Sequence, residues 1–140
     1  MKNKYLLFLV SLIFLSIVHT MKSQNIQRTS FYSNALERVN NVSIYLPPGY
    51  TEDMETFYPV IYFLHGWGGS ENSAETIMEL ADSLILENVI EPVIIVCPNN
   101  SPLPFSGSYF VNSDLNGAYE DYMNVDLVNW MDNNYRTVAD

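Results

Sequence analysis

Five residues, His65, Gly66, Trp67, Gly68 and Gly69, form the pattern in this chain that is best suited to chemistry. They directly follow an apolar run at residues 58–64, which is typical of a strand buried on both faces. A glycine-rich turn after such a strand delivers backbone N–H groups to a site. N–H groups placed in this way can form an oxyanion hole, which stabilises the negative charge that develops on an oxygen during acyl transfer.

An oxyanion hole acts only together with a nucleophile, and the 140 residues contain no Ser or Cys with a glycine two positions before and two after it. The six glycines are Gly49, Gly66, Gly68, Gly69, Gly107 and Gly117. Histidine occurs only at His19 and His65, so a triad in the order Ser, Asp, His cannot be assembled. The sequence therefore predicts an oxyanion loop without catalytic residues in the chain.

The loop has two other interpretations, a plain strand-to-helix turn and a phosphate cradle. The phosphate interpretation is poor because neither a second G-x-x-G nor a Gly-Lys-Ser/Thr element is present. We expect His65 to be a structural hydrogen-bonding residue rather than a catalytic base. Trp67 would act through its backbone N–H, while its ring either lines a pocket or packs against the protein.

A second candidate region is the loop that contains Tyr109, Asn112 and Ser113, which could line a substrate cleft because such loops follow the carboxyl ends of parallel strands. Packing of its aromatic residues is an equally open alternative. Glu120, Asp121 and Asp126 raise the possibility of a glycosidase with paired carboxylates. They lie near the start of a predicted helix, where acidic side chains favour the helix dipole, so we expect a solvated or capping role.

Neither metal nor cofactor is expected, since no two His or Cys residues have metal-ligand spacing. The single cysteine, Cys97, excludes an internal disulfide. It follows the apolar run at residues 93–96, where a buried, inert thiol is expected.

The first 23 residues resemble a secretory signal peptide. Lys2 and Lys4 precede an uncharged apolar run at residues 5–18, and polar residues follow. Cleavage after Thr20 or after Ser23 fits equally well. The run is shorter than the ~20 apolar residues of a membrane span, so we expect a secreted or periplasmic protein without a stable membrane anchor. An uncleaved, membrane-tethered form is the alternative.

Charge argues against nucleic acid as a partner. Removing residues 1–23 removes all three lysines and leaves three arginines against 16 acidic residues, which gives a net charge of −13. Such a surface repels polyanions and anionic lipid, and its simplest role is solubility.

The elements that would position the loop follow an α/β pattern. Residues 27–33 and 39–46 predict two leading strands, the second antiparallel with one wet face. Residues 58–64 and 93–96 predict buried strands, while residues 73–87 and 117–135 have the spacing of amphipathic helices. Residues 99–116 predict a long loop. Two strands followed by two β-loop-α units indicate a parallel core.

Five segments occur in the order and spacing of one family: LPPGY at 46–50, YPVIYFLHGWGG at 58–69, YFVNS at 109–113, YEDY at 119–122 and YRT at 135–137. Residues 27–140 thereby resemble the "Putative esterase" family of α/β hydrolases, which includes esterase D, feruloyl esterases and mycolyltransferases. The resemblance implies the N-terminal half of an α/β-hydrolase sheet over residues 24–140. It also implies that the nucleophile, acid and histidine lie beyond Asp140, and that the N–H after His-Gly, that of Trp67, contributes to the oxyanion hole.

Three functions remain open at this point. The first is a secreted serine esterase acting on carbohydrate-linked or other extracellular esters, of which this chain is the N-terminal part. The second is a non-catalytic glycan-binding module using Trp67, Tyr109 and Phe110, or an inactive remnant, and the third is a membrane-tethered fragment. In the family's sheet, the strand at 58–64 lies between that at 93–96 and one after Asp140. The chain alone should therefore expose an apolar edge, dissolve poorly and lack esterase activity.

Overall fold

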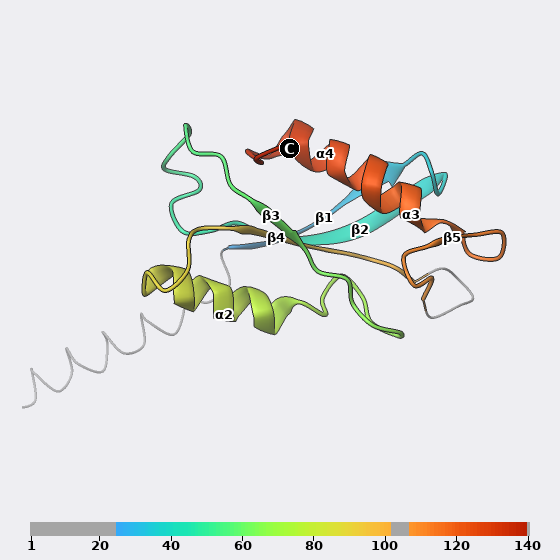
Figure 1. Ribbon diagram of the computed structural model, residues 1–140, viewed down its shortest axis with the longest axis horizontal. Helices are drawn as coiled ribbons and strands as arrows, with labels where there is room; N and C mark the ends of the chain where they lie inside the picture. The colour runs from blue at the N-terminus through green and yellow to red at the C-terminus, as the bar shows by residue number, and fades with distance from the viewer. Residues whose placement is uncertain (1–24, 102–106, 140) are drawn as a thin grey trace, which may run out of the picture.

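The computed structural model describes residues 25–101 and 107–139. The predicted signal peptide at residues 1–23 and part of the predicted loop at 99–116 lie outside these ranges. Four strands form the main sheet, in the order β1, β2, β4, β3 (Figure 1). They span Ile26–Ser33 (β1), Arg38–Tyr45 (β2), Val60–Tyr62 (β3) and Ile94–Pro98 (β4). A helix lies on each face of the sheet.

The sheet is mixed, as the sequence predicts. β1 and β2 form an antiparallel hairpin, and β2 also pairs antiparallel with β4. β3 and β4 pair in parallel, with Ile61 opposite Ile95. Because a helix packs on each face of the sheet, the second half of β2 is buried on both faces, and the predicted wet face is limited to its first residues.

The first helix, α2 (Glu75–Leu86), covers one face of the sheet. It buries Met78, Ala81 and Ile85 against β4 residues such as Ile95. The spacing of apolar residues in the predicted helix at 73–87 also places Ile77 and Leu80 on the apolar face, but both are exposed. The buried residues of this segment, Ala74, Met78, Ala81 and Ile85, follow one another at spacings of four, three and four residues. Ile77 and Leu80 lie outside this buried row.

The opposite face is covered by a continuous helix made of α3 (Tyr119–Asp121), the π-helical segment η1 (Tyr122–Leu127) and α4 (Val128–Asn134). The predicted helix at 117–135 is thus confirmed except at its first residues, since Gly117–Ala118 form β6, which pairs with β5 (Asn112–Ser113). The wider π turn changes the buried face. Leu127 is buried five residues after Tyr122, whereas Val125, which the 3.6-residue period places inside, is half exposed.

β3 is shorter and less buried than the sequence predicts. The interpretation of residues 58–64 as a strand buried on both faces is wrong, because the strand covers three residues and Ile61 is 51% exposed. β3 is an edge strand of the main sheet, and Ile61, opposite Ile95, lies at the exposed margin of the face that α2 packs against. At its start, Tyr58 forms a parallel bridge with Thr137, so the chain after α4 returns to the free edge of β3.

Candidate active-site loop

The predicted oxyanion loop joins the end of β3 to the approach of α2. Its backbone turns sharply, since the N–H of Gly69 donates to the carbonyl of Gly66 at 3.1 Å and Gly68 has a φ of +73°. Glycine adopts this left-handed conformation without a steric penalty. The loop therefore projects beyond the sheet, with Trp67 at its outer end and 62% exposed.

The N–H of Trp67 has no hydrogen-bond acceptor among residues 25–101 and 107–139. A backbone donor normally finds a partner in the protein or in water. Trp67 lies within the turn that is closed by the hydrogen bond from the N–H of Gly69 to the carbonyl of Gly66. An oxyanion-hole donor needs to be free of an acceptor in the protein, and that Trp67 supplies this donor stays a prediction.

The side chain of His65 packs against the backbone of the loop, and the residue is only 6% exposed. Its Nδ1 lies 2.9 Å from the carbonyl oxygen of Gly66, and because that oxygen can only accept, Nδ1 carries the proton. Its ring meets that of Phe110 edge-on at 5.5 Å. Its Nε2 is buried and has no partner within the described part of the chain. This geometry agrees with the structural role expected for His65.

Gly69 is required by close packing. A Cβ at this position would lie 2.6 Å from Nδ1 of His65 and 2.8 Å from Oγ of Ser73. The carbonyl of Gly69 accepts a hydrogen bond from Ser101 Oγ at 3.0 Å, and the N–H of Ser70 donates to Ser73 Oγ at 3.0 Å. These contacts fasten the base of the loop to the chain after β4 and to the approach of α2.

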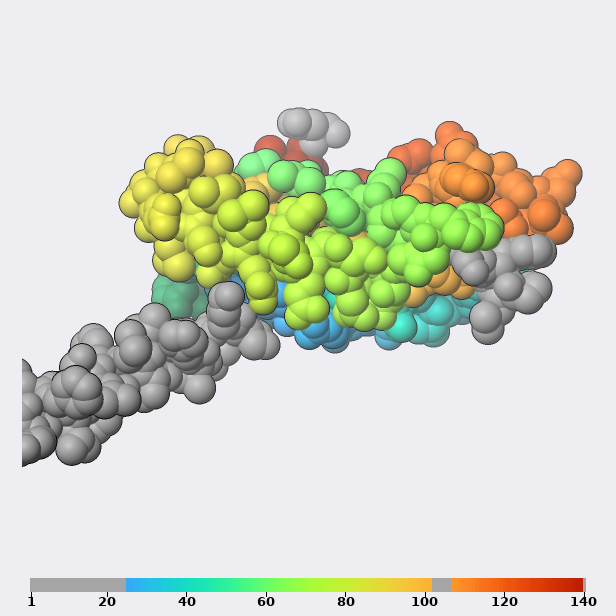
Figure 2. Space-filling model, turned by 90° about the horizontal axis from the view of Figure 1, so that it is seen from below, coloured from blue at the N-terminus to red at the C-terminus, as the bar shows by residue number. Residues whose placement is uncertain are grey.

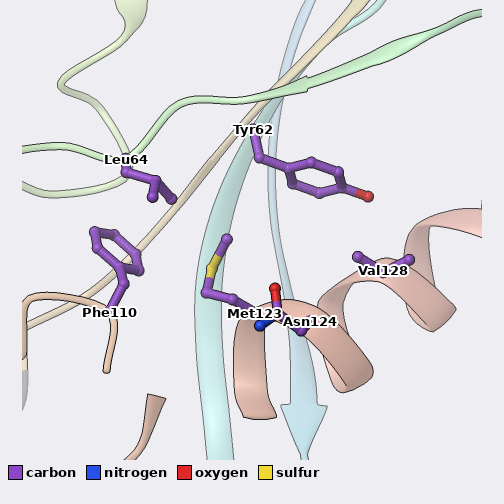
Figure 3. Close-up of a pocket in the computed structure, with 6 residues that line it drawn as sticks. All are labelled: Tyr62, Leu64, Phe110, Met123, Asn124 and Val128. Carbon is purple, nitrogen blue, oxygen red and sulfur yellow. The ribbon is translucent and has the colours of Figure 1, made fainter. Parts of the chain in front are cut away.

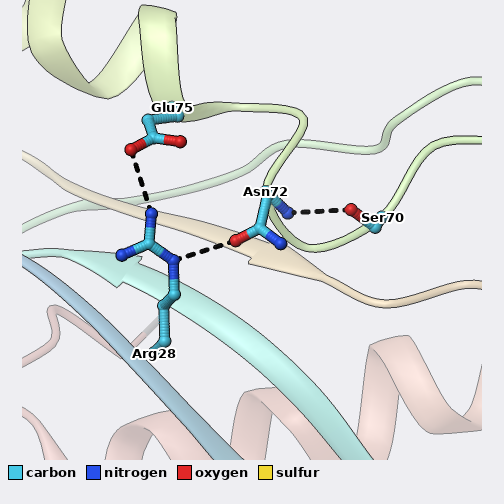
Figure 4. Close-up of polar contacts among 4 residues, drawn as sticks. All are labelled: Arg28, Ser70, Asn72 and Glu75. Carbon is cyan, nitrogen blue, oxygen red and sulfur yellow. Dashed lines mark hydrogen bonds and ion pairs between the residues drawn. The ribbon is translucent and has the colours of Figure 1, made fainter.

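A polar cluster joins the same base to β1 (Figure 4). The guanidinium of Arg28 donates to Asn72 Oδ1 and to Glu75 Oε1, each at 2.9 Å, and the N–H of Asn72 donates to Ser70 Oγ at 3.3 Å. Arg28 and Glu75 are half exposed, so their ion pair contributes at most about 1 kcal/mol. Its effect is to orient the segment between the loop and α2.

Of the predicted cleft residues, the structure brings one to the loop. The ring of Tyr109 lies 5.6 Å from that of Trp67. Asn112 instead accepts hydrogen bonds from the N–H groups of Glu120 and Asp121, at 2.9 and 3.2 Å, and so caps the helix that begins with α3. Ser113 accepts two backbone hydrogen bonds in the turn that follows it. That these residues line a substrate cleft stays a prediction.

An apolar cavity of about 200 Å³ opens beside β3 (Figure 3). Its lining residues come from β3, the segment after it, the loop before β5, the π-helical segment η1 and the start of α4: Tyr62, Leu64, Phe110, Met123, Asn124 and Val128. Burial, and secondarily the charge of Asp132, raises the pKa of Tyr62 to about 12, so its hydroxyl is neutral at physiological pH. The sequence did not predict this cavity. The π-helical segment that helps to line it cannot be recognised from the spacing of apolar residues.

Of the three acidic residues near the helix, Asp126 makes structural hydrogen bonds. Oδ2 of Asp126 accepts hydrogen bonds from Ser33 Oγ at 2.5 Å and from the N–H of Ala35 at 2.8 Å. Asp126 therefore ties the π turn to the β1–β2 hairpin, which is neither the solvated nor the capping role expected for it. In the ranges that the structure describes, no group of His, Cys, Asp and Glu could hold a metal ion. No helix in those ranges is long and apolar enough to cross a membrane.

Residues 33–140 match the family described as "Putative esterase". An endo-1,4-beta-xylanase/feruloyl esterase of Xylanibacter ruminicola is 32% identical over 126 residues, which cover 83% of this chain and 17% of that protein.

Two solved structures share the fold. A ferulic acid esterase superimposes with a TM-score of 0.74 at 22% identity, over 82% of this chain and 46% of that one. A ferulic acid esterase of Anaeromyces mucronatus, solved with ferulic acid, gives 0.63 at 24% identity, over 81% and 44%. The chain thus spans less than half the length of these structures. It belongs to the "Putative esterase" family, and its described part has an α/β fold that corresponds to part of the fold of these α/β-hydrolase structures.

Proposed function

We propose that this chain is the oxyanion-loop part of an exported carboxylic ester hydrolase that works through an acyl-serine intermediate. The observation that carries the proposal is the Trp67 N–H, a backbone donor without an acceptor in the described residues, at the tip of a strand-loop-helix connection. Membership of an esterase family supports the reaction type.

In the proposed reaction, a serine hydroxyl attacks the ester carbonyl while a histidine takes its proton. The N–H of Trp67 donates to the oxygen that becomes negative, and the alcohol leaves with a proton to give an acyl-serine, which water then hydrolyses. One such donor is worth about 3–4 kcal/mol of transition-state stabilisation. The serine, acid and histidine would lie beyond Asp140, since the sequence up to that residue offers no G-x-S-x-G element.

The pairing at the edge of β3 supports a continuation of the sheet. The N–H of Tyr58 donates to the carbonyl of Arg136, and the N–H of Val138 donates to the carbonyl of Tyr58, both at 2.9 Å. This is the start of a parallel strand beside β3. In the family's sheet, the strand at this position leads to the nucleophile.

The proposed substrates are carbohydrate-linked or other extracellular esters. The signal-like N-terminal segment supports export, and the name of the relative from Xylanibacter ruminicola couples a xylanase to a feruloyl esterase. We propose no cofactor and no nucleic-acid partner, in line with the excess of acidic residues.

A fluorophosphonate probe tests the reaction type. Incubated with the complete gene product, it should label a single serine, which peptide mapping would place after Asp140. A folded protein that stays unlabelled would contradict the esterase proposal. It would favour the glycan-binding module or inactive remnant, for which the exposed aromatic residues Trp67 and Tyr109 are the supporting observation.

The role of the loop is tested by two substitutions at one position. Trp67→Pro removes the backbone N–H, whereas Trp67→Ala removes the ring and keeps the donor. We expect Trp67→Pro to lower kcat for an aryl acetate by roughly 10²–10³-fold and Trp67→Ala to lower it much less. Circular dichroism controls for folding of both variants. Equal losses in the two folded variants would show that the N–H is not the catalytic feature.

A further inference from the structure

Two aromatic side chains form an exposed platform beside the candidate oxyanion loop. The rings of Trp67 and Tyr109 are 62% and 75% exposed, and their centroids lie 5.6 Å apart at an angle of 34°. Figure 2 shows the segment after β3, in green, beside the orange segment that contains Tyr109. Paired exposed aromatic rings are one kind of surface that binds ligands.

The backbone is strained where it presents this platform. Tyr109 and Phe110 both have a φ of +54°, a conformation that non-glycine residues rarely adopt. The strain is held by Ser108, whose N–H donates to Oδ1 of Asn100 at 3.0 Å and whose hydroxyl also binds Asn100. Both of these polar residues are buried. The result is that Tyr109 points to solvent while Phe110 lines the apolar cavity. Backbone strain of this kind concentrates at ligand-binding sites.

The indole ring of Trp67 is seated on the same loop. A Cβ on Gly107 would lie 3.1 Å from Cε3 of Trp67, so the ring rests on the glycine backbone. One side of the ring is thereby packed, and the large exposed fraction belongs to the rest of it. This contact joins the ring of Trp67 to the segment that carries Tyr109.

The surroundings of the platform favour an uncharged ligand that stays partly hydrated. The segments at 65–70 and 107–113, which carry the two rings, contain no Asp, Glu, Lys or Arg. Glu71 and Asp114 follow them directly, and the carboxylate of Glu71 accepts a hydrogen bond from Asn99 Nδ2 at 2.6 Å. The platform is open, unlike the cavity beside β3, which would suit an apolar group better. A sugar ring fits such a surface because its C–H face stacks on aromatic rings while its hydroxyl groups remain in water.

We propose that Trp67 and Tyr109 form a stacking site for a sugar ring of a neutral oligosaccharide. In the hydrolase this ring would belong to the alcohol part of the ester, and that assignment rests on the proposed function. The stacking contact itself needs no reaction and can be measured apart from it.

The test is calorimetric titration of the complete gene product with xylohexaose, cellohexaose and mannohexaose. We expect at least one to bind, and Tyr109→Ala and Trp67→Ala each to raise its Kd by about fivefold or more. Tyr109→Ala is the variant less prone to disturb folding, because the ring of Tyr109 is the more exposed of the two. The matched control is Tyr32→Ala, since Tyr32 is 58% exposed on β1, at the opposite edge of the sheet, and its removal should leave the Kd unchanged.

Each outcome decides the proposal. Binding by none of the three sugars, or equal weakening by the Tyr32 and Tyr109 variants, would overturn it. Tighter binding of 4-hydroxycinnamate than of any sugar, lost in Tyr109→Ala, would reassign the platform to an aromatic group and also overturn it. The fluorophosphonate experiment separates the two proposals, because sugar binding without labelling rejects only the esterase and labelling without sugar binding rejects only the platform.

Discussion

The glycines of the active-site loop differ in what they tolerate, although the sequence shows them as one motif. Gly69 has His65 and Ser73 within 3 Å of where a Cβ would be, whereas Gly66 has nothing within 4 Å and lacks a positive φ. We expect Gly69→Ala to lower the free energy of unfolding by about 1–3 kcal/mol through overpacking. Gly66→Ala should leave it unchanged or raise it by up to about 1 kcal/mol.

Urea unfolding of the complete gene product measures both variants. The prediction would be wrong if the two substitutions had the same effect. That result would mean that His65 moves aside at little cost, and that the loop is not held by this contact.

Cys97 gives the stability of the fold a pH dependence. Burial raises the pKa of its thiol to about 11, from the 9.0 of an exposed thiol. The folded state therefore holds the proton more tightly than the unfolded chain, and stability is complete below about pH 9 and falls as pH rises towards 11. The pKa of Tyr62, raised to about 12, extends the loss to higher pH.

The measurement is the free energy of unfolding from pH 8 to pH 11. Cys97→Ala should be less stable at pH 8 because it leaves a cavity in the core, but its stability should fall less steeply above pH 9. Identical slopes for the two proteins would contradict a buried, protonated thiol.

At the scale of elements, the helix that begins with α3 depends on a residue outside it. Asn112, on β5, accepts hydrogen bonds from the N–H groups of Glu120 and Asp121. We expect Asn112→Ala to lower the free energy of unfolding by about 1 kcal/mol, and Asn112→Asp, which keeps the acceptor, to lower it less. Thermal unfolding compares them. A Tm loss in the Asp variant equal to that in the Ala variant would argue against capping.

Helices and strands were predicted correctly where residues close together in the sequence determine the local structure. The two helices and the β-loop-α order follow from local period and turn residues, and the fold class is confirmed. The π turn at η1 was not predictable, because an extra residue per turn changes which side chains are buried without changing composition. Met123 is therefore buried and Val125 half exposed, contrary to the 3.6-residue period.

At the scale of the molecule, the limit of sequence reasoning is contact between distant segments. The glycine pattern indicated the loop that carries the Trp67 N–H. The contact of Trp67 with Tyr109, and the cavity that Phe110 shares with η1, join segments far apart in the chain. The exposure of Ile61 is a similar case, since an apolar strand predicts burial but cannot say whether a neighbour covers it.

That exposure leads to a prediction for residues 24–140 expressed alone. Beyond the Tyr58–Thr137 bridge, no described segment pairs with the free edge of β3, and Ile61 and Leu64 are half exposed there. Unpaired backbone groups beside apolar side chains promote pairing with other chains. We expect the fragment to sediment as oligomers and to hydrolyse no aryl acetate.

Ile61→Lys should shift the fragment towards monomer, because a charge at an edge opposes strand pairing. Val39→Lys, at a residue 61% exposed on β2, should not. A monomeric, cooperatively unfolding wild-type fragment would show that the edge of β3 is protected without a further strand.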